Sequence, residues 1–180
     1  MGRMVLVVGP SGAGKDTLIN MAKEALKDDT RFHFVRRVVT RAADAGLEDH
    51  DTMSKAAFAD AKRNGAFALC WDAHGLSYGI PAGIDEEIAA GRTVVANGSR
   101  RMIGDALLRY PDAQIVLVEA PQEVRAARLA GRGRESLGEV SARLAREAPL
   151  PAGVKVTRID NSGDLQVALS AFIATVRAKN

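Results

Sequence analysis

The feature that most constrains this chain is a glycine-rich run near its N-terminus, Gly9-Pro10-Ser11-Gly12-Ala13-Gly14-Lys15. Its spacing, Gly-x-x-x-x-Gly-Lys, is that of the Walker A phosphate-binding loop. The apolar run Met4–Val8 precedes it, and apolar residues from Leu18 to Leu26 follow at helical spacing. A strand, a glycine-rich turn and a helix in this order direct backbone N–H groups and a positive helix end toward one point. We therefore expect a nucleotide phosphate site, with Lys15 reaching the β and γ phosphates.

The residue after the lysine departs from the usual loop. A Ser or Thr there normally offers a hydroxyl to Mg²⁺, whereas this chain has Asp16. A carboxylate is a charged oxygen ligand of the kind that Mg²⁺ accepts, so we expect Asp16 to hold the ion directly or through water. The alternative is that Asp16 is only a first-turn acid favoured by the helix dipole. Thr17 is a candidate donor to the α-phosphate.

Strand-like and helix-like patterns alternate along the rest of the chain. Short apolar runs at Thr93–Ala96, Ile115–Val118 and Val154–Ile159 have the character of buried parallel strands, and helical patterns follow each of them. This order predicts an α/β fold, a P-loop NTPase sandwich of three layers with a parallel sheet. The length of 180 residues suits one domain, with its core in residues 1–31 and 82–180.

The stretch of about residues 32–81 interrupts the alternation and predicts an insertion over the carboxyl edge of the sheet, where ligands bind in such folds. We expect an extended segment over Phe32–Thr40 and a polar loop over Arg41–Met53. A helix capped by Ser54 should follow, then a strand over Phe67–Trp71 and a loop over His74–Pro81.

Arginines crowd one later stretch of the chain, residues 125–146. Arginine clusters suit a small polyphosphate ligand. The six arginines of this stretch are Arg125, Arg128, Arg132, Arg134, Arg143 and Arg146. We expect Arg125 and Arg146 to be ordinary surface charges and the other four to face the phosphates.

Charge and cysteine content narrow the class of partner. The net charge is only +3 and aromatic residues do not alternate with basic ones, so nucleic-acid binding is not expected. No apolar segment approaches the length of a membrane span. The single Cys70 cannot form an internal disulfide, and we expect a cytoplasmic protein. The sequence leaves the oligomeric state open, and a homodimer is compatible with it.

The whole chain resembles the guanylate-kinase-like branch of P-loop kinases. The resemblance rests on the loop Gly9–Lys15, Thr40-Arg41, Tyr78-Gly79, the lid motif beginning Arg128-Leu129, and Asn161 after the last strand. It implies that Asn161 lies near the adenine, that the insertion at about residues 32–81 binds the acceptor, and that about residues 128–146 form a lid. Several positions depart from guanylate kinase itself. Asp44 replaces an arginine, no clear acid stands near Cys70-Trp71, Ile80-Pro81 replaces Ser or Thr, and Asn97 replaces Asp. The loss of groups that read a purine argues against a purine acceptor.

A closer resemblance is to the ribose 1,5-bisphosphate phosphokinase family, which is linked to phosphonate breakdown. The matching segments are the phosphate loop with its Asp16, the stretch from Thr40 to His50, Trp71 to Gly79, Asn97 to Arg100, and Arg128 to Glu135. They occur in the right order over nearly the whole chain.

The resemblance implies that ATP phosphorylates ribose 1,5-bisphosphate to 5-phosphoribosyl 1-diphosphate with Mg²⁺. The acceptor would be a phosphate oxygen, which is already ionised near neutral pH, so positioning and charge neutralisation remain. Lys15, Arg128, Arg132, Arg134 and Arg143 would stabilise the transferred group. The candidates for acceptor binding are Thr40, Arg41, Glu48, His50, Tyr78, Asn97 and Arg100, with Arg37 and Arg36 next.

Two other functions stay open at this point. The first is a nucleoside monophosphate kinase that acts on GMP or a related acceptor. The second is a guanylate-kinase-like interaction module without catalysis, although such modules commonly lose the phosphate loop that Lys15 and its flanking glycines keep here.

Overall fold

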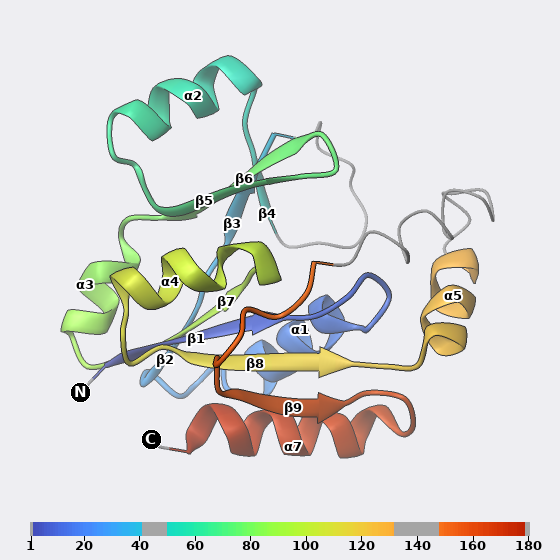
Figure 1. Ribbon diagram of the computed structural model, residues 1–180. Coiled ribbons are helices and arrows are strands. Elements are labelled where there is room, and N and C mark those ends of the chain that lie inside the picture. Colours follow the sequence, from blue (N-terminus) through green and yellow to red (C-terminus); the bar gives the residue numbers. More distant parts are fainter. Residues whose placement is uncertain (1, 41–49, 132–147, 179–180) are drawn as a thin grey trace.

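Two sheets organise the residues that the computed structural model describes, which are 2–40, 50–131 and 148–178 (Figure 1). The larger sheet has five strands in the order β2-β7-β1-β8-β9, and every neighbouring pair in it is parallel. These strands are β1 (Arg3–Val8), β2 (Phe32–Phe34), β7 (Thr93–Asn97), β8 (Gln114–Glu119) and β9 (Val156–Asp160).

Helices cover both faces of this sheet, which explains why its central strands are apolar throughout. Met4, Leu6 and Val8 of β1 belong to the buried cluster on the first face of the sheet, while Val5 and Val7 belong to the cluster on the second face. On the second face α1 (Lys15–Ala25) packs beside α7 (Leu165–Arg177). The first face is covered by α3 (Ile84–Ala89), the short 3₁₀ helix η1 (Arg100–Met102) and α4 (Ile103–Arg109). The predicted three-layer α/β sandwich is confirmed.

The smaller sheet has four strands in the order β4-β3-β6-β5 and lies beside α2 (Lys55–Arg63) (Figure 1). Its strands are β3 (Arg37–Val39), β4 (His50–Thr52), β5 (Phe67–Ala73) and β6 (Leu76–Pro81). Ser54 caps α2 as expected, because its hydroxyl accepts from the backbone N–H of Ala57 at 3.1 Å.

The predicted loop over His74–Pro81 is wrong, because most of it forms β6. Residues 74 and 75 make the two-residue turn of a hairpin, with φ of 53° at His74 and 74° at Gly75. The second glycine of the stretch, Gly79, lies inside the strand. Likewise, the predicted loop over Arg41–Met53 ends in a strand, β4, which pairs in parallel with β3.

The extended segment Phe32–Thr40 is two strands in two different sheets. β2 pairs with β7 in the larger sheet, whereas β3 pairs with β4 and β6 in the smaller one. Residues 32–34 are therefore part of the core sheet and not of the insertion, which begins after them. The chain crosses between the sheets at Val35 and Arg36. Across the described ranges, no helix combines the length and the apolar character needed to cross a membrane.

Candidate active site

The glycine-rich loop connects β1 to α1 at the carboxyl end of the larger sheet. Gly14 has a φ of 87°, and a Cβ there would collide with the side chain of Asn161, so the position requires glycine. The amine of Lys15 donates to the backbone carbonyl of Gly9 at 2.9 Å and of Pro10 at 3.4 Å. Lys15 therefore folds over the loop, with its charge held where phosphates would bind.

Two side chains from later in the chain hold the loop in place. Asn161, only 2% exposed, follows β9 and donates from Nδ2 to the carbonyl of Ala13 at 2.8 Å. Arg128 lies on α5 (Gln122–Gly131), and its Nη2 donates to the carbonyl of Asn161 at 2.7 Å. Its Nη1 donates at 3.4 Å to the carbonyls of Gly12 and Ala13. The phosphate loop, α5 and the segment after β9 are thus joined through one guanidinium.

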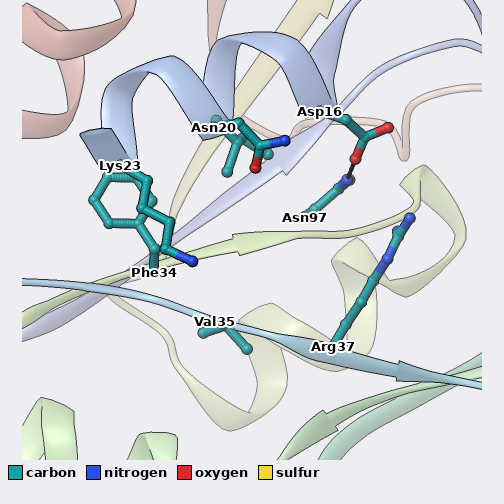
Figure 2. A pocket seen from close by; sticks show the side chains of 8 residues that line it. Asp16, Asn20, Lys23, Phe34, Val35, Arg37 and Asn97 are labelled. Atoms are coloured by element: carbon teal, nitrogen blue, oxygen red, sulfur yellow. Dashed lines mark hydrogen bonds between the residues drawn. The ribbon is translucent and has the colours of Figure 1, made fainter. Parts of the chain in front are cut away.

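Asp16 in the first turn of α1 accepts a hydrogen bond from Nδ2 of Asn97, the last residue of β7 (Figure 2). Parallel pairing of β1 with β7 sets Asn97 opposite Val7, so the two strands end together beside the loop. Asn97 is predicted to bind a ribose hydroxyl, and in the structure its amide nitrogen orients the Asp16 carboxylate. Its Oδ1 is buried and has no hydrogen-bond partner among the described residues.

A pocket of about 390 Å³ that opens to solvent extends from Asp16 along α1 (Figure 2). Lys23 and Arg37 bring positive charge to it, and Asp16 is the one acid among the described residues that line it. The lining residues are Asp16, Ile19, Asn20, Lys23, Phe34, Val35, Arg37 and Asn97.

Asn20 and Lys23 line the pocket but are not predicted as site residues from the sequence. Their spacing from Asp16, at four and seven positions, puts all three on one face of a helix. This spacing can be read from the sequence, but by itself it indicates only a solvated helix face. In the structure, Phe34 of β2 and Arg37 of β3 line the same pocket and make this face part of it.

Arg37 is held by a stack of aromatic rings on the smaller sheet. Its guanidinium carbon lies 5.2 Å from the ring centre of Tyr78, a cation–π distance. The Tyr78 ring stacks on Trp71 at 5.1 Å with an interplanar angle of 8°. Thr40 supports the same strands, because its hydroxyl accepts from the N–H of Ser77 at 2.8 Å. Of the predicted acceptor residues, Tyr78 therefore contacts Arg37, and Thr40 bonds to Ser77, the residue next to Tyr78.

Two further predicted acceptor residues, Arg100 and His50, have other contacts in the structure. Arg41 and Glu48 lie outside the described ranges. Arg100 on η1 donates to the carbonyl of Ala148 at 3.0 Å. His50 is buried at the start of β4, and its carbonyl accepts from Arg36 at 3.3 Å. Arg36 also pairs with Asp51 at 3.0 Å. The residues outside the described ranges are Arg41, Glu48, Arg132, Arg134, Arg143 and Arg146.

The expectation that Arg125 is a surface charge is wrong. Its side chain is 8% exposed, and its Nε donates to the carbonyl of Ala120 at 3.0 Å, which ties α5 to the end of β8. Helical periodicity turns this position inward, and an internal carbonyl satisfies the buried guanidinium.

On β5, burial raises the pKa of the Cys70 thiol, which disfavours the thiolate that a nucleophile needs.

Comparison with known proteins gives relatives over almost the full length, although no family model matches the chain. The chain is 51% identical over 173 residues to a protein of Brucella melitensis named ribose 1,5-bisphosphate phosphokinase PhnN, covering 96% of this chain and 90% of that protein. It is 46% identical over 174 residues to a protein of the same name from Rhizobium etli, covering 96% and 88%. A crystal structure of guanylate kinase from Anaplasma phagocytophilum matches with a TM-score of 0.73 and 16% identity, covering 97% and 85%. This last match shows a guanylate-kinase fold.

Proposed function

The chain belongs to the ribose 1,5-bisphosphate phosphokinase family, and from that premise we propose that it transfers the γ-phosphoryl group of ATP to ribose 1,5-bisphosphate. The products are ADP and 5-phosphoribosyl 1-diphosphate, in the context of phosphonate breakdown. The observation that carries the proposal is the continuity between the phosphate loop and a positively charged pocket, with Asp16 at their junction.

The chemistry of the acceptor agrees with the residues of this pocket. The attacking oxygen belongs to a phosphate that is ionised near neutral pH, so the site does not need a general base. It needs instead to bring two polyanions together, and the cations Lys15, Lys23 and Arg37 supply charge for that. Arg132, Arg134 and Arg143 remain predicted contacts of the transferred group, and Thr17 remains a predicted contact of the α-phosphate.

The residues around Asp16 fit a magnesium ion. Mg²⁺ in kinases is commonly bound by one or two carboxylates together with substrate phosphates and water. Asp16 offers one carboxylate, which Asn97 orients at the edge of the phosphate loop. When bound, the ion neutralises charge on the β and γ phosphates. This supports Asp16 as a ligand of the metal that accompanies ATP.

A paired acceptor assay tests the proposed function. The guanylate-kinase fold makes GMP the natural competitor, so ribose 1,5-bisphosphate and GMP are each supplied with Mg-ATP at equal concentration. We expect turnover of the sugar bisphosphate and little turnover of GMP. The Lys15→Ala variant should lose essentially all activity, because Lys15 is the loop's own contact to the β and γ phosphates. Faster turnover of GMP than of the sugar bisphosphate would contradict the proposed function.

A cytoplasmic location belongs to the same proposal. It is supported by the single cysteine, which has no partner for an internal disulfide. The homodimer stays a prediction that sedimentation analysis would check.

A further inference from the structure

One face of α1 continues the active site away from the phosphate loop. Asp16, Asn20 and Lys23 follow one another along this face and all line the pocket. The opposite side of the helix packs into the core through Leu18 and Ala22. With a rise of 1.5 Å per residue, the backbone of Lys23 lies about 10 Å along the helix from that of Asp16. Lys23 therefore marks the end of the pocket that is remote from the metal-binding carboxylate.

The two cations of the pocket lie on opposite sides of it. Figure 2 shows Lys23 on one side and Arg37 on the other, with Asn20 and Asn97 between them. The Arg37 side chain extends toward Asp16, and its stacking on Tyr78 stiffens it in that direction. A ligand that fills this pocket meets a positive charge at each end and amide groups in the middle.

That arrangement matches an acceptor with two anionic groups joined by a polar ring. We propose that Lys23 binds the 5-phosphate of ribose 1,5-bisphosphate, the group that is not phosphorylated, while Arg37 holds the reacting 1-phosphate near Asp16. The inference rests on the proposed function and names a specificity residue for it. An ammonium group suits a terminal phosphate because its three donors can bind several oxygens from changing directions.

An exposed lysine on a helix is ordinarily a solvated charge, and Lys27 provides that comparison in this chain. Lys27 lies just beyond α1, is well exposed, and pairs with Glu24 at 2.5 Å. It does not line the pocket, whereas Lys23 does. The two residues carry the same charge one helical turn apart, so Lys27→Ala is a matched control for Lys23→Ala.

The test compares two acceptors that differ only in the 5-phosphate, ribose 1,5-bisphosphate and ribose 1-phosphate. A hydrogen-bonded contact to a charged group contributes about 1.5–3 kcal/mol, so Lys23→Ala should lower kcat/KM for the bisphosphate by about 10- to 100-fold. The same variant should leave kcat/KM for ribose 1-phosphate and the KM for ATP within about twofold of wild type. Lys23→Arg should recover most of the loss, and Lys27→Ala should behave as wild type.

Calorimetric Kd values for both acceptors in the absence of ATP give the same comparison without catalysis. An equal loss for both acceptors in Lys23→Ala, or no loss for the bisphosphate, would overturn the role of Lys23 while leaving the proposed function standing. Failure of the wild-type protein to turn over ribose 1,5-bisphosphate would instead remove the proposed function, and this inference with it.

Discussion

At the scale of single residues, the contact between Asp16 and Asn97 is central to the site. It fixes the direction of the carboxylate that departs from the usual phosphate loop and that we propose as the magnesium ligand. The amide nitrogen of Asn97 is used in this contact, which makes Asn97 a positioning residue for the carboxylate. Changes at Asp16 and at Asn97 should therefore alter the Mg²⁺ concentration that the activity requires.

We predict that Asp16→Ala raises the Mg²⁺ concentration for half-maximal rate and lowers activity by about 10²-fold at limiting metal. Asp16→Ser should keep most of the activity, because a hydroxyl at this position is the usual ligand of the Walker loop. Asn97→Ala should have an intermediate effect of about tenfold, as expected for loss of a residue that orients a ligand. Titration of the initial rate with Mg²⁺ measures all three. Unchanged half-saturation in Asp16→Ala would show that Asp16 serves only the helix dipole.

Arg128 is a second residue of the site with a predicted role. It was predicted to contact the transferred group, and in the structure it bridges the phosphate loop and Asn161. We therefore expect Arg128→Ala to raise the KM for ATP by about 10- to 100-fold, because its two contacts to the loop and its contact to Asn161 are lost together. Arg128→Lys should rescue little, since one ammonium cannot span the same carbonyls.

Arg158→Ala is the control for Arg128, because Arg158 forms an exposed pair with Glu119 at 2.7 Å. Such pairs contribute little, so its kinetics should match wild type. Steady-state kinetics with varied ATP separate the two roles of Arg128. A fall in kcat with an unchanged KM would favour direct contact with the transferred phosphoryl group.

At the scale of elements, the β5–β6 hairpin carries Tyr78 and depends on a glycine for its packing. A Cβ at Gly79 of β6 would lie 2.6 Å from the ring of Phe67 on β5. That ring stacks in turn on Phe58 of α2 at 4.6 Å. The hairpin and α2 are thus packed through one aromatic pair, which leaves no space for a side chain at position 79.

We predict that Gly79→Ala lowers the free energy of unfolding by about 1–3 kcal/mol, because the methyl group displaces the Phe67 ring. Gly83→Ala is the control. Gly83 has a φ of −56°, and a Cβ there meets no atom within 4 Å. That variant should stay within about 0.5 kcal/mol of wild type. Urea midpoints at constant m-value measure both changes. Equal midpoints for the two variants would contradict the packing argument.

At the scale of the whole molecule, a polar bridge joins α3 to the end of α4 on one face of the larger sheet. The hydroxyl of Tyr110 donates to Oδ1 of Asp85 at 2.5 Å, and Arg109 donates to Oδ2 at 2.6 Å. Burial, and then the hydrogen bond to Asp85, raise the pKa of Tyr110 to about 12. The neutral phenol is therefore the form that the folded protein favours.

A raised pKa contributes stability that is complete below the unfolded value near 10 and is lost as the pH rises toward 12. We predict that the wild-type protein melts at a higher temperature than Tyr110→Phe at pH 8 and that this difference shrinks between pH 10 and 12. Thermal melts of both proteins across this range measure the difference. A constant gap would show that Tyr110 does not titrate in the bridge.

The sequence by itself determined the features that depend on near neighbours. The phosphate loop follows from spacing, because the φ values of its glycines and the helix after it are local properties. The alternating apolar runs determined the parallel sheet and its layers. The cap at Ser54 was equally readable. Family resemblance then pointed to the ribose 1,5-bisphosphate phosphokinases, and relatives of 46–51% identity confirm that the chain belongs to this family.

Only the tertiary structure decided how distant segments meet. Asn97 reaches Asp16 across 81 positions, and Arg128 reaches Ala13 across 115, through strand pairings and helix packing that no local pattern encodes. The same is true of β6, because the two glycines at positions 75 and 79 favour a loop in the sequence, whereas in the structure Gly79 lies within the strand against the ring of Phe67. Lys23 shows the reason most directly. Its helical spacing is in the sequence, but a helix face becomes part of a site only when another element lies opposite it.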